Sequence, residues 1–356
     1  MIDFIKKLEK KLDTQIIHSE KRIKGKNYFN LDSDGNIKTL SIWETNLKDL
    51  NVLLPIADNL VELDVGYCNI KTLGPLKRFS KLETLDLSLN RLHASSLRHL
   101  NYLKNLKKLD LGVTNLKDTS PLSNLTNLEK LCVSGSDRLY EVKGLEKLKS
   151  LEYLDVGGSP ISSIKKINAP DTLRHLSIRG DEIEKLAYLD KFPNLESFVF
   201  EGDIEKIEGL DELQKLKELF ISGNGLKKIE GLDKLQNLEM LDLCLNRITE
   251  IKGLDALVNL KQLNLNENEI VKIENLDNLT KLELLLVEAN YNLSNFDTRF
   301  LQNLESECHI YIRGFKDSDK IKSMAPENVK INFKKDYPYP MSLKFFSQFY
   351  TSSILD

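Results

Sequence analysis

Residues 216–281 read LKELFISGNGLKKIEGLDKLQN, LEMLDLCLNRITEIKGLDALVN and LKQLNLNENEIVKIENLDNLTK, three consecutive segments of 22 residues with one shared apolar pattern. This pattern, LxxLxLxxNxIxxIxxLxxLxx, recurs with small slips along residues 37–303. The twelve copies begin at Ile37, Leu60, Leu82, Leu106, Leu128, Leu151, Leu173, Leu195, Leu216, Leu238, Leu260 and Leu282. A fixed period of about 20–50 residues is typical of solenoids, in which each copy packs on its neighbours.

Each copy contains two kinds of apolar spacing. The first apolar positions alternate, which is typical of a strand with one buried face. After the asparagine position they recur every third residue, as at Ile229, Leu232 and Leu235, which fits a 3₁₀ or extended return segment better than an α-helix. The sequence therefore predicts an α/β repeat fold, a right-handed horseshoe-like solenoid. Its concave side is a parallel β-sheet, and its convex side is 3₁₀ or extended.

The asparagine position almost always holds a short polar side chain. The twelve copies carry Thr45, Cys68, Asn90, Thr114, Ser136, Ser159, Asp181, Asp203, Asn224, Asn246, Asn268 and Asn290 there. At a buried bend such a side chain can bond to backbone groups that the turn leaves unpaired. We expect a structural role for this column, with a weaker ladder at Cys68.

The repeat resembles the 22-residue subclass of leucine-rich repeat proteins, typified by the phosphatase regulator SDS22 and by internalins. The resemblance covers residues 37–303 and implies the leucine-rich repeat fold with a protein-binding role. In SDS22, alternating acidic and aromatic residues between the second and third leucines help to grip the phosphatase. Here that column runs Asp155, Ser177, Val199, Phe220, Asp242, and only the last pair is of that type. A phosphatase 1 regulator and a surface adhesin of the internalin kind are the alternatives.

Residues 1–36 are predicted to cap the first copy. Ile2, Phe4, Ile5, Leu8, Leu12 and Ile16 recur at helical spacing, which indicates a cap helix or, alternatively, a membrane-surface helix. The following YFNLDSDGNIKTLSI indicates a hairpin around Asp34 and Gly35. Asp32, Asp34 and Asn36 also resemble the start of a calcium loop, but its closing glutamate is missing.

Residues 304–356 are predicted to form an irregular C-terminal cap. CHIYIRG and NVKINF read as two further strands, joined by the helix-compatible KDSDKIKSMA. The aromatic residues Phe345, Phe346, Phe349 and Tyr350 are expected to cover the last coil. Alternatively, they form a patch for a partner or for a second copy of the chain.

Composition and charge limit the class of protein. The 356 residues include 51 Lys and Arg against 54 Asp and Glu, a net charge of −3, which argues against a nucleic-acid binder. The start, MIDFIKKLEKKLDTQ, has lysines where a secretory signal would be apolar. The four cysteines, Cys68, Cys132, Cys244 and Cys308, stand singly, as in a reducing compartment. We predict a cytoplasmic protein that binds neither membrane nor nucleic acid.

The sequence carries little that indicates catalysis. It has no glycine-rich phosphate loop, HExxH or GxSxG motif, so we predict no enzyme activity, no cofactor and no metal. The best look-alike is His175 and Ser177 on one predicted strand, with Asp155 in the column of Ser177 on the strand before. A hydrolase would also need an oxyanion hole and a pocket that excludes water, which an open sheet does not offer.

The outward-facing strand positions predict an acidic concave face. They hold Glu44, Glu62, Asp64, Asp86, Asp110, Asp155, Glu201, Glu218, Asp242, Glu267 and Glu288 against Lys108, Lys130 and Arg179. Eleven acidic and three basic residues leave a charge of −8 on this face, which would attract a basic surface.

Apolar residues interrupt the acidic ones in two groups. The first is Trp43, Tyr67, Leu89 and Val113, and the second is Val199, Phe220, Met240, Leu245, Leu284 and Leu286. Exposed large apolar residues are typical of interface anchors. We therefore predict a non-enzymatic scaffold that binds a protein partner. The predicted contact residues are Trp43, Asp64, Tyr67, Asp86, Asp110, Asp155, Val199, Glu201, Glu218, Phe220, Met240, Asp242, Leu245, Glu267, Leu284, Leu286 and Glu288.

Overall fold

The computed structural model describes residues 2–23, 26–180, 182–313, 315 and 318–333. The chain divides into two compact units. The first holds the residues up to Pro160 together with Lys166–Leu173, and the second holds Ile161–Lys165 together with the residues from Arg174 on. The aromatic residues Phe345, Phe346, Phe349 and Tyr350 of the predicted C-terminal cap lie outside the described residues.

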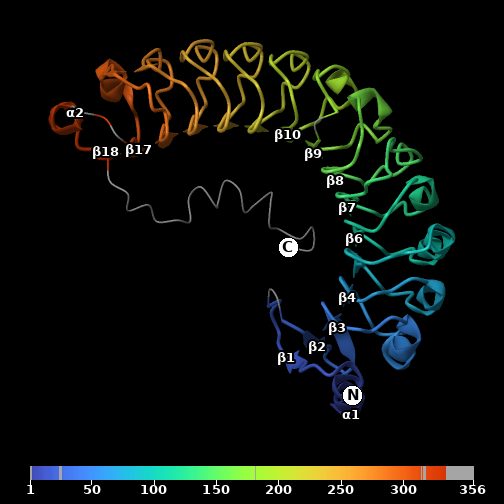
Figure 1. The fold of residues 1–356 in the computed structure, drawn as a ribbon. Coiled ribbons are helices and arrows are strands. Elements are labelled where there is room, and N and C mark those ends of the chain that lie inside the picture. The colour runs from blue at the N-terminus through green and yellow to red at the C-terminus, as the bar shows by residue number, and fades with distance from the viewer. Residues whose placement is uncertain (1, 24–25, 181, 314, 316–317, 334–356) are drawn as a thin grey trace. The chain divides into compact units, whose positions relative to one another are not determined.

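The first unit is a stack of coils built on a mainly parallel sheet. Its strands are β1 (Ile17–His18), β2 (Tyr28–Leu31), β3 (Ile37–Ser41), β4 (Glu62–Asp64), β5 (Thr84–Asp86), β6 (Lys108–Asp110), β7 (Lys130–Cys132) and β8 (Tyr153–Asp155). They pair in chain order, and only β2 and β3 are antiparallel. The return segments carry the 3₁₀ helices η1 (Leu50–Ile56), η2 (Gly74–Arg78), η3 (Ala94–Tyr102) and η4 (Ser120–Leu122). Figure 1 shows the helices of this unit on the side of the coils opposite the strands.

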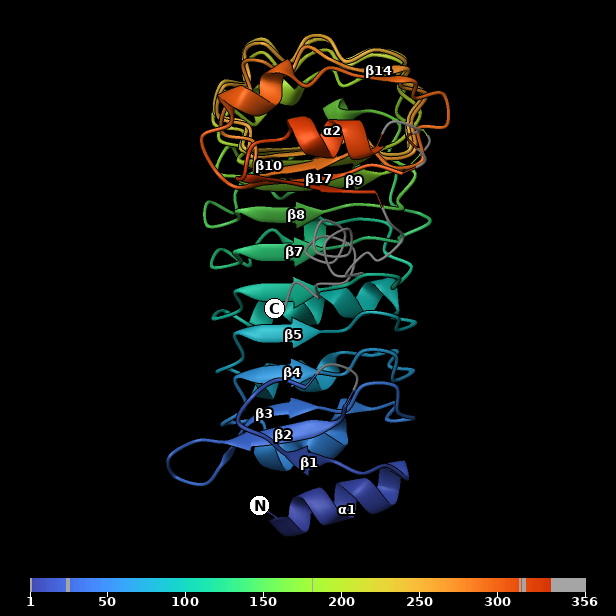
Figure 2. The same ribbon diagram turned by 90° about the vertical axis from the view of Figure 1, so that its left-hand side faces the viewer.

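The predicted N-terminal cap is confirmed in its elements. Helix α1 (Ile2–Leu12) buries Ile5, Leu8 and Leu12, and Figure 2 shows it beside β1 at the start of the stack. The hairpin between β2 and β3 turns at Asp32, whose Oδ1 accepts bonds from the backbone amides of Asp34 (3.0 Å) and Asn36 (2.8 Å). This carboxylate therefore closes the turn, as the hairpin interpretation predicts.

The second unit continues the same coil in another parallel set of strands. These are β9 (His175–Arg179), β10 (Ser197–Glu201), β11 (Glu218–Phe220), β12 (Met240–Asp242), β13 (Gln262–Asn264), β15 (Leu284–Leu286), β17 (Cys308–Tyr311) and β18 (Val329–Asn332). The short helices are η6 (Leu189–Lys191), η7 (Arg299–Asn303) and α2 (Ser318–Met324), and η5 (Ile164–Lys166) precedes β9. The two strands and the helix predicted between residues 308 and 333 are confirmed.

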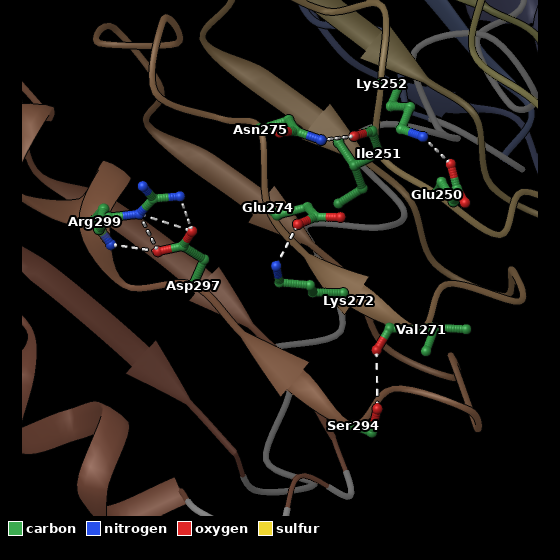
Figure 3. A network of polar contacts seen from close by, with 10 residues as sticks. All are labelled: Glu250, Ile251, Lys252, Val271, Lys272, Glu274, Asn275, Ser294, Asp297 and Arg299. Atoms are coloured by element: carbon green, nitrogen blue, oxygen red, sulfur yellow. Dashed lines mark hydrogen bonds and ion pairs between the residues drawn. The ribbon is translucent and has the colours of Figure 1, made fainter.

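A small second sheet lies on the return side of the second unit. Strand β14 (Lys272–Ile273) pairs in parallel with β16 (Asn295–Phe296). Figure 3 shows the polar contacts around it, which include ion pairs of Lys252 with Glu250, Lys272 with Glu274 and Arg299 with Asp297. Two further bonds join neighbouring coils, from the Asn275 Nδ2 to the Ile251 carbonyl (2.8 Å) and from the Ser294 Oγ to the Val271 carbonyl (3.4 Å).

The leucine columns form the core of each unit. In the first unit Leu85, Leu109 and Leu131 lie opposite one another on β5, β6 and β7, and all three are fully buried. Burying an apolar side chain of this size contributes about 1.5–3 kcal/mol. A single coil could not exclude water from its leucines, so the stack is what stabilises every copy.

The asparagine column supplies the hydrogen bonds that the buried turns lack. The Asn246 side chain donates to the carbonyls of Ile221 (2.9 Å), Leu243 (3.0 Å) and Cys244 (3.2 Å), and its Oδ1 accepts from the Leu226 amide (3.2 Å). At Cys68 a weaker sulfur contact replaces the asparagine bonds: its Sγ lies 3.0 Å from the Ile42 carbonyl. Asp203 departs from the pattern because it is exposed, and Asp181 lies outside the described residues.

Candidate functional site

The sheet face of the first unit brings four predicted carboxylates together. Asp64, Asp86 and Asp110 lie opposite one another on β4, β5 and β6, and Asp155 follows on β8 after Cys132 on β7. Neighbouring strands of a sheet are about 4.8 Å apart, so Asp64, Asp86 and Asp110 are adjacent, and Cys132 separates them from Asp155. We call Asp64, Asp86, Asp110 and Asp155 the carboxylate row.

The carboxylate row is less exposed than the sequence indicates. Asp86 is 5 % exposed and Asp110 8 %, and Asp155 is buried as well, whereas Asp64 is half-buried. Each Oδ1 accepts a bond from the backbone amide two residues later, as in Asp110 with Gly112 (2.8 Å). Most of these predicted outward-facing carboxylates are therefore covered, because the turn after each strand folds back onto its carboxylate.

Burial also reduces the negative charge of this row. Desolvation, together with the neighbouring Asp64 carboxylate, raises the pKa of Asp86 to about 6. Desolvation and the Asp86 carboxylate raise the pKa of Asp110 to about 8. Desolvation raises the pKa of Asp64 too, although the amide of Gly66, the hydroxyl of Ser41 and the charge of Arg22 oppose that rise. At neutral pH Asp110 is therefore mostly protonated, and the row carries less than its formal charge.

The remaining acidic residues of the predicted face differ in exposure. Glu44, Glu62 and Glu267 are exposed, and Glu201, Glu218 and Glu288 are half-buried. Lys108 and Lys130 are half-buried on β6 and β7. On the predicted face of the first unit the exposed negative charge therefore comes mainly from Glu44 and Glu62.

Three apolar residues of the first unit are exposed in an unusual backbone conformation. Tyr67, Leu89 and Val113 stand at the same turn position of consecutive copies, with φ of 53°, 55° and 55°. They are 50 %, 41 % and 51 % exposed. The next two copies place Gly135 and Gly158 there, also at positive φ. Bulky residues avoid this left-handed region, and β-branched ones most of all. We call Tyr67, Leu89 and Val113 the exposed apolar row.

The backbone holds the exposed apolar row in place. The amides of Tyr67, Leu89 and Val113 donate to carbonyls of the following copy, at 2.9, 2.8 and 2.7 Å. The half-buried ring of Trp43 lies 6.0 Å from the ring of Tyr67, which continues the row toward the N-terminus. Tyr67, Leu89 and Val113 of the first predicted apolar group are thus exposed at equivalent positions of consecutive copies, and Trp43 is half-buried beside Tyr67.

The second predicted apolar group is closed instead of exposed. Val199, Phe220, Leu284 and Leu286 form a buried cluster with Tyr311, and Met240 packs against it half-buried. These residues come from neighbouring strands, so each covers the next. Only Leu245 of this group is exposed, at a φ of 57° that matches the exposed apolar row. Tyr311 was missed because β17 lies beyond the twelve copies, although the alternation of CHIYIRG could have indicated it.

Asp242 lies within the second unit beside that cluster and is buried. Its Oδ2 accepts a bond from the Asn264 Nδ2 (3.0 Å) and its Oδ1 one from the Cys244 amide (2.9 Å). Desolvation raises its pKa to about 6 in spite of these bonds. Like Asp86, it stabilises a turn and presents little charge to a partner.

The residues considered for catalysis do not form an accessible site. Ser177 and Asp155 are buried and belong to different units, and His175 is half-buried. Within the described part of the chain, no three His, Cys, Asp or Glu side chains are grouped to hold a metal ion. None of the helices described there is long and apolar enough to cross a membrane.

Comparison with known proteins supports the fold. A family model for leucine-rich repeats (2 copies) matches residues 214–256. A leucine-rich repeat protein of Leptospira interrogans superposes with a TM-score of 0.60 at 19% identity, over 83% of this chain and 90% of that one. An internalin of Listeria monocytogenes superposes with a TM-score of 0.53 at 21% identity, over 74% and 90%.

A chain from the LRIM1/APL1C complex superposes with a TM-score of 0.56 at 16% identity, over 94% of this chain and 71% of that one. A search of curated proteins by sequence finds no match. At these identities the likeness concerns the fold, which is a leucine-rich repeat solenoid.

Proposed function

We propose that this protein is a non-enzymatic cytoplasmic scaffold that holds a protein partner with a basic surface against the sheet face of its first unit. The observation that carries the proposal is the exposed apolar row, Tyr67, Leu89 and Val113. Because Phe220 is buried, we place the anchors in this row and no longer in the second unit.

The exposed apolar row costs stability without contributing to the core. A residue with a Cβ in the left-handed region costs about 1–2 kcal/mol relative to its ordinary conformation. Glycine, which avoids this cost, occupies the equivalent positions 135 and 158. Because about half of each side chain faces solvent, packing within the fold returns little of that energy. Side chains of this kind regain it when a partner covers them, as at the centres of protein interfaces.

The charges beside the row favour a basic partner. Glu44 and Glu62 are exposed at the N-terminal strands of this unit, whereas the mostly buried carboxylate row adds only part of its formal charge. Complementary charge mainly raises the association rate and orients the partner, whereas apolar anchors supply affinity. The partner surface that fits combines apolar side chains with Lys or Arg.

Three further observations support the proposal. The row is fixed by the backbone bonds between copies, so it loses little conformational freedom on binding. All four cysteines are free and buried, in keeping with a reducing compartment. A chain of the same fold was also solved in the LRIM1/APL1C complex.

The test is affinity capture from the native lysate with the double variant Leu89→Gly/Val113→Gly. Glycine relieves the left-handed strain, so this variant is expected to keep or raise its melting temperature while losing the partner. Leu245→Gly is the matched control, because Leu245 has the same φ and exposure in the second unit. We expect this control to retain the partner.

A partner held equally by the wild type and by Leu89→Gly/Val113→Gly would refute the proposed anchors. Capture that strengthens with added salt would refute the electrostatic part, because salt screens an attraction between opposite charges. Recovery of a protein phosphatase 1 catalytic subunit, lost in the double variant, would identify the SDS22-like alternative. Recovery of a cell-surface protein would instead point to the adhesin alternative.

A further inference from the structure

A groove on the helix side of the first unit has no role in the proposed scaffold function. Its volume is about 810 Å³, and it is lined by η1, η2, η3 and the turn before η3. Small-molecule sites typically enclose about 300–1,000 Å³, so this groove has the size of one. The helices η1, η2 and η3 that line it lie on the side of the coils opposite the strands (Figure 1).

The three-residue period of the 3₁₀ helices explains why the lining residues face the same groove. Side chains three apart lie above one another in such a helix. Leu54 of η1 follows Asn51 at that spacing, Arg78 of η2 follows Pro75, and Tyr102 of η3 follows His99. Because three consecutive copies stack, these pairs line one groove although they are distant in sequence.

The groove lining holds three cations. Lys77, Arg78 and Arg98 line it, and its lining within the described residues includes no Asp or Glu. Lys77 and Arg98 make no ion pair with any residue that the structure describes. Arg78 pairs with Asp58 at 3.2 Å, but both side chains are more than half exposed, so this pair contributes little. Three cations gathered in a chain of net charge −3 form a ready site for an anion.

The same lining also holds an aromatic pair and an exposed leucine. Tyr102 is 56 % exposed, and its ring stacks on that of His99 with centroids 6.4 Å apart and an angle of 27°. The His99 Nδ1 lies 2.9 Å from the Ser96 carbonyl, which can only accept, so this nitrogen donates and fixes the ring. Leu54 is also exposed in this groove. The Tyr102 ring is therefore fixed by His99 on one side and exposed to solvent, so another planar ring can stack on it.

We propose that this groove binds a nucleoside polyphosphate. Its phosphates contact Lys77, Arg78 and Arg98, and its base stacks on Tyr102. The guanidinium groups suit phosphate oxygens because they donate two parallel hydrogen bonds to them. A bare anion would leave Tyr102 without a stacking partner, and an uncharged ring would leave Lys77 and Arg98 without a counter-charge.

The test is isothermal titration calorimetry of the full chain with ATP, tripolyphosphate and adenosine as separate probes. ATP is expected to bind at least about tenfold more tightly than either fragment, because only ATP can contact both the cations and Tyr102. Arg98→Ala and Tyr102→Ala are each expected to weaken ATP about tenfold, the loss that follows removal of a charged hydrogen bond or a stacking partner. Arg138→Ala, an exposed arginine of the same unit outside the groove, is the matched control and should bind as the wild type.

Three results would overturn the proposal. One is no heat of binding with ATP at millimolar concentration, and another is equal affinity for ATP and tripolyphosphate, which would leave the base unrecognised. The third is ATP affinity unchanged in Arg98→Ala. Thermal unfolding of each variant checks the fold, which should persist because both side chains are exposed. Partner capture by Arg98→Ala should be unaffected, so this experiment stands apart from the test of the scaffold.

Discussion

Replacing Gly231 by alanine should destabilise the second unit far more than its place on a surface turn indicates. Gly231 has a φ of +71°, and a Cβ built there would lie 2.3 Å from the backbone oxygen of Ile207 in the preceding copy. Gly209 and Gly253, one copy before and after, meet the preceding copy in the same way at 2.5 Å. Because the opposing atom is backbone, the coils would have to move apart.

The magnitude follows from comparison with Gly223 in the same copy. Gly223 has a φ of +66°, but its Cβ would meet only the Glu201 side chain, at 3.5 Å. Gly223→Ala therefore pays only the left-handed cost, about 1 kcal/mol. Gly231→Ala has that same cost and also displaces a packed coil, so it should lower the free energy of unfolding by about 3 kcal/mol in total. Their difference, about 2 kcal/mol, measures the close approach between copies.

Thermal unfolding followed by circular dichroism measures this difference. For a domain of this size about 1 kcal/mol corresponds to roughly 2–4 °C, so Gly231→Ala should melt about 4–8 °C below Gly223→Ala. Gly231→Asn is a third variant, because Asn275 occupies the equivalent position two copies later, where its Nδ2 donates to the Ile251 carbonyl (Figure 3). We expect the larger asparagine to cost less than alanine. Equal melting of Gly231→Ala and Gly223→Ala would refute the argument.

The remaining predictions concern buried groups. Asn246→Ala removes the hydrogen-bond partner of the Leu226 amide and of three carbonyls. It should lower the free energy of unfolding, measured by urea denaturation, by about 2–4 kcal/mol. A loss below about 0.5 kcal/mol, the size expected of a surface substitution, would contradict this prediction. The folded pKa of Asp110 is raised from 3.8 to about 8, so the wild type should lose stability as pH rises from about 4 to 8. Asp110→Asn should lose less over that window and be more stable at pH 8, and parallel curves would exclude this titration. Phe220→Ala opens the buried cluster and should cost about 3–5 kcal/mol, whereas an exposed anchor would cost under about 1.

The sequence predicts the coil and its register well because these depend on periodic apolar residues. Leu85, Leu109 and Leu131 are opposite one another and buried, as the spacing requires. The asparagine column was predictable because only a short polar side chain can serve a buried turn, and Asn246 makes the bonds expected of it. The hairpin at Gly35 followed from its turn residues.

Exposure on the sheet face was not predictable from the period. Alternation tells which side of a strand a residue faces, but not whether the following turn covers it, as it covers Asp86 and Asp110. It also cannot tell that Phe220 and Leu286 pack into one cluster. The sequence shows that Val113 is apolar, but the left-handed conformation of its backbone could not be predicted from it. The basic groove was missed because Lys77 and Arg98 come from return segments of different copies.

The asparagine ladder gives the array a direction. The Asn246 oxygen accepts the Leu226 amide, the Asn268 oxygen accepts the Ile248 amide, and the Asn290 oxygen accepts the Ile270 amide. In these three turns the asparagine oxygen that completes the turn belongs to the copy that follows. Trimming the chain from its C-terminal end orphans a neighbour, whereas an interior copy can be duplicated in tandem because it brings both halves of the joint. Such a joint lets the number of copies grow during evolution without any new interface having to arise.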